Sequence, residues 1–255
     1  MSGNHYENIL GYQIATDSIE GCVKKIISWI ESGEGTQYFV CANPHSICLA
    51  QNDGLSKTAL QSADLITPDG IGVVIASKIL GGTLRNRVTG SDIFAGINAY
   101  LNSREGSRIF FLGSTEKTFK RIKEKMAGKY PRIKHIQTYS PPFKEEFNAE
   151  DNTQMIRAIN EFVPHVLWVG MTAPKQERWI YQNKDLLNVR SIGAVGAVFD
   201  FFTGNVKRSH PFYLKAGLEW LPRLLQEPRR LWRRNFISTP KFLFKVILQR
   251  FNLNI

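Results

Sequence analysis

Short apolar segments, each followed by a glycine, proline or polar turn, recur along most of this 255-residue chain. Continuous apolar runs of about 4–8 residues are typical of parallel strands that are buried on both faces. Helical spacing follows two of them, over about 45–62 and over 71–80, where Gly81-Gly82 ends the helix. This alternation predicts an α/β fold, with a Rossmann-like, mostly parallel sheet and helices on both faces. The predicted strands are Tyr38–Cys41, Leu65–Ile66, Arg108–Gly113, His135–Tyr139, His165–Gly170 and Ser191–Gly196.

Positive charge is concentrated near the C-terminus. Residues 207–255 hold eleven Lys or Arg against two acids, a net +9 of the chain's total of +11, and they also carry Trp and Phe. Arginine interleaved with aromatic residues is typical of a segment that lies on an anionic membrane surface or grips phosphates. We therefore predict two units, an α/β domain over 1–206 and a basic, amphipathic helical appendage over 207–255. Pro222 and Pro228 divide the appendage into short helices.

Several protein classes are disfavoured by what the sequence lacks. It shows no secretory signal and no run of roughly 18–20 apolar residues that would span a bilayer. Its three cysteines, Cys22, Cys41 and Cys48, are expected to be free thiols in a reducing cytosol. No Asp-x-Asp pair, P-loop or Gly-x-Gly-x-x-Gly motif is present, and the five His are scattered. We therefore predict neither a metal nor a cofactor.

Polar residues follow the first two predicted strands. Ligands of open parallel sheets bind beyond the carboxyl ends of the strands, and Asn43 and Asp69 stand at two such ends. Pro68 and Gly70 flank Asp69. Since proline fixes φ and glycine permits unusual φ, the three residues are expected to form a defined turn. Such a turn either holds one carboxylate in place as a general base or leaves it solvated.

Two further strand ends carry candidate ligand-binding residues. Gly113 and Ser114 precede a helix. The free backbone N–H groups at its start either form a phosphate cradle or are simply capped by the Ser114 side chain. Pro174 suits the first turn of the next helix, so that Lys175 and Gln176 are expected to project toward a ligand.

Separated blocks of residues also match a known family in order. The chain resembles, from about Leu10 to Asn235, the WecG/TagA/CpsF family of bacterial glycosyltransferases, glycosyltransferase family 26. The matching blocks are Asn43–His45, Thr67–Gly72, Arg87–Asp92, Gly170–Glu177, Gly196–Gly204, Lys207-Arg208, Leu218–Leu224 and Glu227–Leu231.

The resemblance implies an inverting transferase that moves a sugar, N-acetylmannosamine or another hexose, from a UDP-sugar to an undecaprenyl-diphosphate-linked saccharide. It implies a role in cell-surface polysaccharide synthesis, without a metal, by a cytoplasmic protein attached peripherally to the inner face of the cell membrane. Asp69 matches the proposed base, and Asn43 a residue near the acceptor or the base. Arg87, Gln176 and Asp200 match residues of the active site.

Positive charge near the departing diphosphate must come from the chain if no metal supplies it. Arg223, Arg230 and Arg234 follow one another at i, i+7 and i+11, close to one helical face, and the resemblance implies contact with the lipid diphosphate and the nucleotide. One departure concerns Cys41, where many relatives have Thr. A thiol is a weaker hydrogen-bond donor than a hydroxyl, which weakens a catalytic role at this position.

Two alternatives remain open. A basic α/β module could use its C-terminal segment on single-stranded nucleic acid; binding to anionic liposomes but not to oligonucleotides would exclude it, and we predict no nucleic-acid partner. A family member could instead assist another capsule transferase without catalysing transfer, which an assay of the purified chain alone would decide. The donor sugar, the acceptor sugar, the pathway and a possible homo-oligomer are left open.

Overall fold

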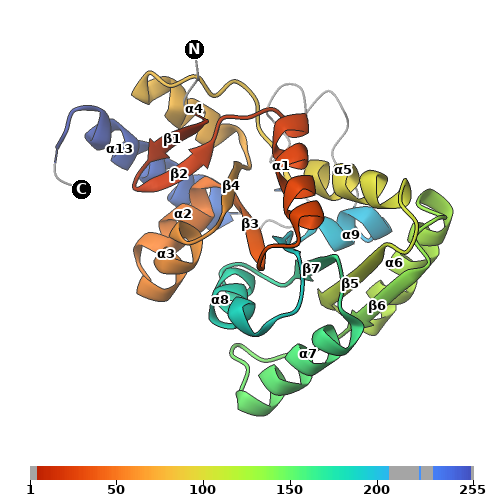
Figure 1. The fold of residues 1–255 in the computed structure, drawn as a ribbon. Helices are drawn as coiled ribbons and strands as arrows, with labels where there is room; N and C mark the ends of the chain where they lie inside the picture. Colours follow the sequence, from red (N-terminus) through yellow and green to blue (C-terminus); the bar gives the residue numbers. More distant parts are fainter. Residues whose placement is uncertain (1–4, 207–223, 225–231, 254–255) are drawn as a thin grey trace.

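A single sheet of eight strands forms the centre of the computed structural model, which describes residues 5–206, Leu224 and 232–253. The strand order is β1-β2-β4-β3-β8-β7-β5-β6 (Figure 1). Only β1 and β2 pair antiparallel, and every other pairing is parallel. The strands are β1 (Tyr6–Ile9), β2 (Tyr12–Ala15), β3 (Gln37–Ala42), β4 (Leu65–Pro68), β5 (Arg108–Gly113), β6 (His135–Tyr139), β7 (Val166–Gly170) and β8 (Ser191–Ala194).

Helices cover both faces of the sheet, which confirms the predicted α/β architecture. One face packs against α2 (Pro44–Gln51), α3 (Gly54–Gln61), α4 (Ile71–Leu80), α7 (Ala149–Phe162), α8 (Lys175–Asn183) and α13 (Thr239–Arg250). The other packs against α1 (Ile19–Ser32), α5 (Gly90–Asn102), α6 (Glu116–Lys129) and α9 (Val198–Thr203). The short 3-10 helix η1 (Lys184–Leu186) and the π-helix η2 (Arg234–Ser238) complete the described elements.

The central strands are buried on both faces, as their continuous apolar sequence predicts. In β7, Trp168 is fully buried, with its ring centroid 6.1 Å from that of Phe39 in β3 and 5.0 Å from that of Phe94 in α5. All six strands predicted from the sequence are present, two with the predicted ends and four with ends shifted by one or two residues. The antiparallel β1–β2 hairpin at the sheet edge was not predicted.

Two local expectations were wrong. The helical stretch over about 45–62 is two helices, α2 and α3, because the Asp53 carboxylate accepts a hydrogen bond from Ser56 N at 2.6 Å and starts a new helix. Asp53 also forms an ion pair with Arg178 at 2.9 Å. Ser114 does not cap α6; it adopts a φ of 55°, and Thr115 Oγ1 accepts the capping bond from Thr118 N at 3.3 Å.

The last described helix, α13, packs into the core. Phe242 and Val246 are fully buried against the face covered by α2 and α4. Gln249 Oε1 accepts a hydrogen bond from Leu10 N at 2.8 Å, which ties α13 to the β1–β2 turn. The division into units at residue 206 stays a prediction, since 207–223 and 225–231 lie outside the described residues. No helix within the described ranges is both long and apolar enough to cross a membrane.

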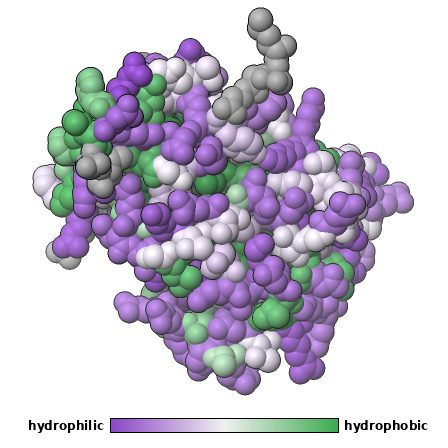
Figure 2. Space-filling model, turned by 60° about the vertical axis from the view of Figure 1, so that its left-hand side comes forward, coloured by the Kyte–Doolittle hydropathy of each residue, from purple (hydrophilic) through white to green (hydrophobic). Residues whose placement is uncertain are grey.

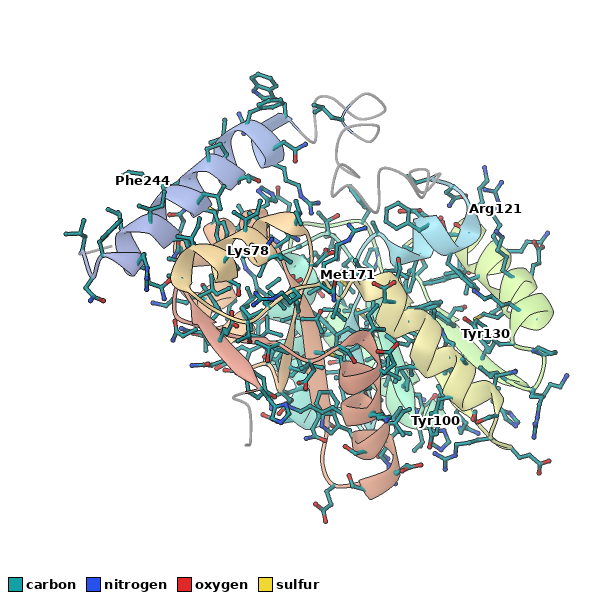
Figure 3. All side chains as sticks on the ribbon, turned by 90° about the horizontal axis from the view of Figure 1, so that it is seen from above. Lys78, Tyr100, Arg121, Tyr130, Met171 and Phe244 are labelled. Atoms are coloured by element: carbon teal, nitrogen blue, oxygen red, sulfur yellow. The ribbon has the colours of Figure 1, made fainter. Side chains whose placement is uncertain are left out.

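The outer side of the C-terminal segment is apolar. Figure 2 brings forward the left-hand side of Figure 1, where α13 lies. Apolar side chains gather at the upper left of the face that it shows. The side chain of Phe244 is 60% exposed and lies on the outer side of α13 (Figure 3). The exposed large apolar residues of this segment are Trp232, Phe236, Ile237, Phe244, Ile247, Phe251 and Leu253.

Candidate active site

The carboxyl ends of β3 and β8 form a topological switch point. The two strands are neighbours, with Val40 opposite Ala194. The helix that follows β3, α2, packs on one face of the sheet, whereas the helix that follows β8, α9, packs on the other. Helices that diverge in this way leave a crevice at the strand ends, where ligands of open α/β sheets bind.

Asn43 and Asp69 stand side by side at this edge. Their strands pair in register with Ala42 opposite Pro68, and Asp69 N donates a hydrogen bond to Ala42 O at 2.8 Å. The Asn43 side-chain oxygen caps α2 by accepting from His45 N and Ser46 N, both at 3.1 Å. The cap fixes the carboxamide next to the Asp69 turn, as the strand-end pattern predicts.

Cys41 lies on β3, two residues before Asn43. The Thr67 hydroxyl donates to Cys41 Sγ at 3.4 Å from the neighbouring strand. Burial raises the pKa of the Cys41 thiol far above its usual value, and the nearby carboxylate of Asp69 raises it further. The thiol is therefore neutral at physiological pH, and it contributes a weak hydrogen-bonding group rather than a charge.

The start of α5 closes one side of the site. Val88 N donates to Pro68 O at 2.8 Å, which brings Arg87 alongside the Asp69 turn. A Cβ at Gly90 would lie only 3.3 Å from Cys41 Sγ and 3.2 Å from a methyl of Val198 in α9. Gly90 therefore allows α5, β3 and α9 to meet, a role that the sequence alone did not reveal.

The ends of β5 and β7 form the other side of the crevice. Gly113 pairs with Gly170, and a Cβ on Gly113 would lie 2.6 Å from the Gly170 carbonyl oxygen. The Ser114 carbonyl accepts from the Ser140 hydroxyl at 2.8 Å. With Thr115 as its cap, the start of α6 matches the simple-cap alternative, and phosphate binding by Gly113 and Ser114 stays a prediction.

Gln176 connects the loops that follow β7 and β8. Its side chain is 5% exposed, and its Oε1 accepts from Met171 N at 3.3 Å and from Gly196 N at 3.0 Å. Its Nε2 donates to Glu177 Oε1 at 2.9 Å. Met171 lies near the centre of the molecule when it is viewed from above (Figure 3). The buried Gln176 side chain therefore holds together the two loops that follow β7 and β8.

Two other predicted residues, Lys175 and Asp200, contact other parts of the protein. Lys175 donates to the Lys144 carbonyl and lies over the Phe147 ring, 3.6 Å from its centroid, rather than beside Asp69. Partial burial lowers the pKa of Lys175, and Asp151 opposes that shift. Asp200 Oδ1 accepts from Asn205 Nδ2 at 3.4 Å, on the α6 side of α9.

The C-terminal segment reaches the site through η2. His45, two residues after Asn43, has its Nδ1 2.9 Å from Ser238 Oγ. Burial lowers the pKa of His45, and the Arg234 guanidinium lowers it further. Arg223 and Arg230 lie outside the described residues. In the sequence His45 stands out only as part of the block Asn43–His45, and its contact with Ser238 has no signal there.

A cavity of about 580 Å³ borders the site between α5, α6 and α9. Ser91, which follows Gly90, and Val198 line it on the side nearest Cys41. Lys125, Lys129 and Tyr130 also line it. Of the residues predicted for the site, those that the structure describes do not line this cavity.

Fold and site together define a doubly wound α/β protein whose polar groups gather at the switch point of a parallel sheet. Comparison with known proteins specifies it further. The Glycosyl transferase WecG/TagA/CpsF family matches residues 7–255, and the chain belongs to this family of glycosyltransferases.

Named relatives agree with one another. The chain is 32% identical over 220 residues to an N-acetylglucosaminyldiphosphoundecaprenol N-acetyl-beta-D-mannosaminyltransferase of Bacillus spizizenii, an overlap of 86% of this chain and 82% of the relative. A protein of the same name from Bacillus subtilis is 33% identical over 82% of this chain and 78% of its own length. One from Staphylococcus aureus strain MW2 is 27% identical, over 94% and 91%.

Proposed function

We propose that this protein is an inverting glycosyltransferase that moves a hexose, of the N-acetylmannosamine type, from a UDP-sugar to an undecaprenyl-diphosphate-linked saccharide. The names of its relatives supply the acceptor, a lipid-linked N-acetylglucosamine, and the transferred sugar. The observation that carries the proposal is the pairing of Asp69 with Asn43 at the switch point of the sheet.

Asp69 is the proposed general base. It takes the proton from the acceptor hydroxyl as that oxygen attacks the anomeric carbon, while the bond from that carbon to the UDP oxygen breaks on the opposite side. Attack from the opposite side inverts the anomeric centre. The Asn43 carboxamide, fixed by its capping bonds, is placed to orient the attacking hydroxyl.

Arginine side chains are the proposed source of positive charge for the departing diphosphate. Arg87 lies beside the Asp69 turn, and Arg234 is near enough to His45 to lower the pKa of that side chain. Arginine suits this role because its guanidinium binds two phosphate oxygens at once and remains charged. Arg223 and Arg230, which precede Arg234 in the same basic segment, are proposed to act with it.

We further propose that the protein attaches peripherally to the cytoplasmic face of the membrane through its C-terminal segment. Exposed apolar side chains of α13 and η2 occur there together with most of the net charge. Each basic residue near an anionic leaflet contributes about 1 kcal/mol to binding. This attachment would bring the crevice close to the lipid diphosphate.

The test is a transfer assay with the purified full-length chain and no other protein. A short-chain lipid diphosphate carrying N-acetylglucosamine is incubated with UDP-N-acetylmannosamine, UDP-N-acetylglucosamine, UDP-glucose or UDP-galactose in turn. We expect transfer from UDP-N-acetylmannosamine, with inversion seen by NMR. Transfer from none of the donors, or only after a second transferase is added, would contradict the proposal and favour the non-catalytic alternative.

A further inference from the structure

Glu177 is a buried acid without an assigned role. It lies in the first turn of α8 and is only 3% exposed. One carboxyl oxygen, Oε1, accepts from Gln176 Nε2 at 2.9 Å, and the other, Oε2, is buried with no hydrogen-bond partner among the described residues. Its neighbour Arg178 forms an ion pair with Asp53 instead. A buried carboxyl group that forms no ion pair within the described part of the chain is costly, which calls for a reason to keep it.

The reason we find lies in the two ends of the Gln176 carboxamide. Its oxygen must face Met171 N and Gly196 N, because both are hydrogen-bond donors. A flipped carboxamide would place its own NH₂ against these two donors and lose both bonds. Since Glu177 Oε1 accepts from the NH₂ end, the flipped orientation would lose a third bond.

The two donors belong to the loops that shape the crevice. Met171 follows β7, and Gly196 follows β8, the strand that pairs with β3. Val195, in the second loop, has its carbonyl 3.7 Å from where a Cβ on Gly90 would stand, in the same place where Gly90 approaches Cys41. Movement of these loops would therefore reach the packing beneath Asp69.

We propose that Glu177 is a positioning residue, which holds the Gln176 carboxamide in one orientation and through it fixes the loops after β7 and β8. As a claim about transfer, this rests on the proposed function. As a claim about the coupling of two side chains, it can be tested on the protein without any substrate.

Three single variants, one control variant and one double variant separate the possibilities. Glu177→Gln keeps an accepting oxygen at the same place, whereas Glu177→Ala removes it. We expect Glu177→Gln to retain kcat within about threefold and Glu177→Ala to lose roughly 10- to 100-fold in kcat with little change in KM for the UDP-sugar, as for a misplaced site. Gln176→Ala should resemble Glu177→Ala. Glu161→Gln, at an exposed position on α7, is the control for removing a carboxylate.

The double variant Gln176→Ala/Glu177→Ala tests whether Glu177 acts through Gln176. We expect it to be no slower than Gln176→Ala, and its urea unfolding midpoint to fall by less than the sum of the two single shifts. Additive losses in both rate and midpoint, or a Glu177→Gln variant as slow as Glu177→Ala, would overturn the proposal. If the wild-type chain transfers no sugar, the proposed function fails, and the unfolding midpoints still decide whether the two side chains are coupled.

Discussion

Asp69 occupies a turn that leaves its backbone little freedom. Pro68 precedes it, Gly70 follows with a φ of 100°, and its own N–H is bonded to Ala42. We expect Asp69→Asn to retain the fold and to lose transfer by about 10²–10⁴-fold, the usual effect of removing a general base. Initial rates and circular dichroism of the purified variant check this.

Asp185→Asn is the matched control, because Asp185 is a highly exposed carboxylate on η1, away from the crevice. It should leave the rate unchanged. Near-normal turnover by Asp69→Asn would show that another group accepts the proton.

Glu177 predicts a pH-dependent stability difference. Burial raises the pKa of its carboxyl group, and the nearby groups that interact with it electrostatically are Tyr38 and Cys41 on β3 and Arg178 on α8. The folded state therefore holds a proton that the unfolded state releases above about pH 4.3, so this contribution to the free energy of unfolding declines as pH rises. Glu177→Gln has no proton to lose, and its stability relative to wild type should improve between pH 4 and pH 7. Urea unfolding at a series of pH values measures the difference, and a constant difference would contradict this assignment.

At single positions, the sequence predicted what depends on neighbours along the chain. Asn43 and Asp69 were found because each directly follows an apolar strand, and parallel strands end at one edge. The contacts of Gln176 with Gly196, twenty residues away, and of His45 with Ser238, 193 residues away, depend on tertiary packing. The ammonium group of Lys175 lies over the Phe147 ring, a contact that no local pattern encodes.

Among the elements, α13 has two sides with different expected roles. Phe244 and Ile247 are exposed, whereas Phe242 and Val246 are buried. We expect Phe244→Ser/Ile247→Ser to weaken binding to anionic vesicles by tenfold or more while leaving the unfolding midpoint nearly unchanged, since each exposed side chain would contribute about 1–2 kcal/mol when inserted into the interface. Vesicle co-sedimentation at fixed lipid composition measures this.

The control for surface apolarity is Leu186→Ser, an exposed position on η1. Undiminished vesicle binding by the double variant would place the membrane contact elsewhere.

Phe242→Ala should instead destabilise the protein by about 3–5 kcal/mol, because it leaves a cavity in the core. Deleting the whole segment would remove Phe242 and Val246 as well, so it cannot distinguish loss of attachment from loss of folding.

Element types were predicted better than element ends. A strand or helix is recognised from its own apolar period, whereas a helix break depends on one competing side chain, as Asp53 shows. The β1–β2 hairpin was not predicted, because its strands are four residues each and lie at the sheet edge. The helices expected between Lys207 and Leu231 lie outside the described residues and stay a prediction.

For the whole molecule, we expect transfer to persist in excess EDTA. The sequence has no Asp-x-Asp pair, and no group of three His, Cys, Asp or Glu within the described ranges is arranged to hold an ion. Arg87 and Arg234 are expected to neutralise the departing diphosphate instead. The assay compares initial rates before and after chelation. A loss restored by Mg²⁺ or Mn²⁺ would reveal a metal site that the arginines do not replace.

The packing of α13 also has a consequence for how the protein folds as it is made. Its contacts with the β1–β2 turn and with α4 join residues that are 239 and 170 positions apart. The surfaces of α2 and α4 that pack against α13 therefore stay open to water while the ribosome makes the intervening chain. Contacts of such high sequence separation form slowly, so nascent chains would present these surfaces to chaperones until translation has passed α13.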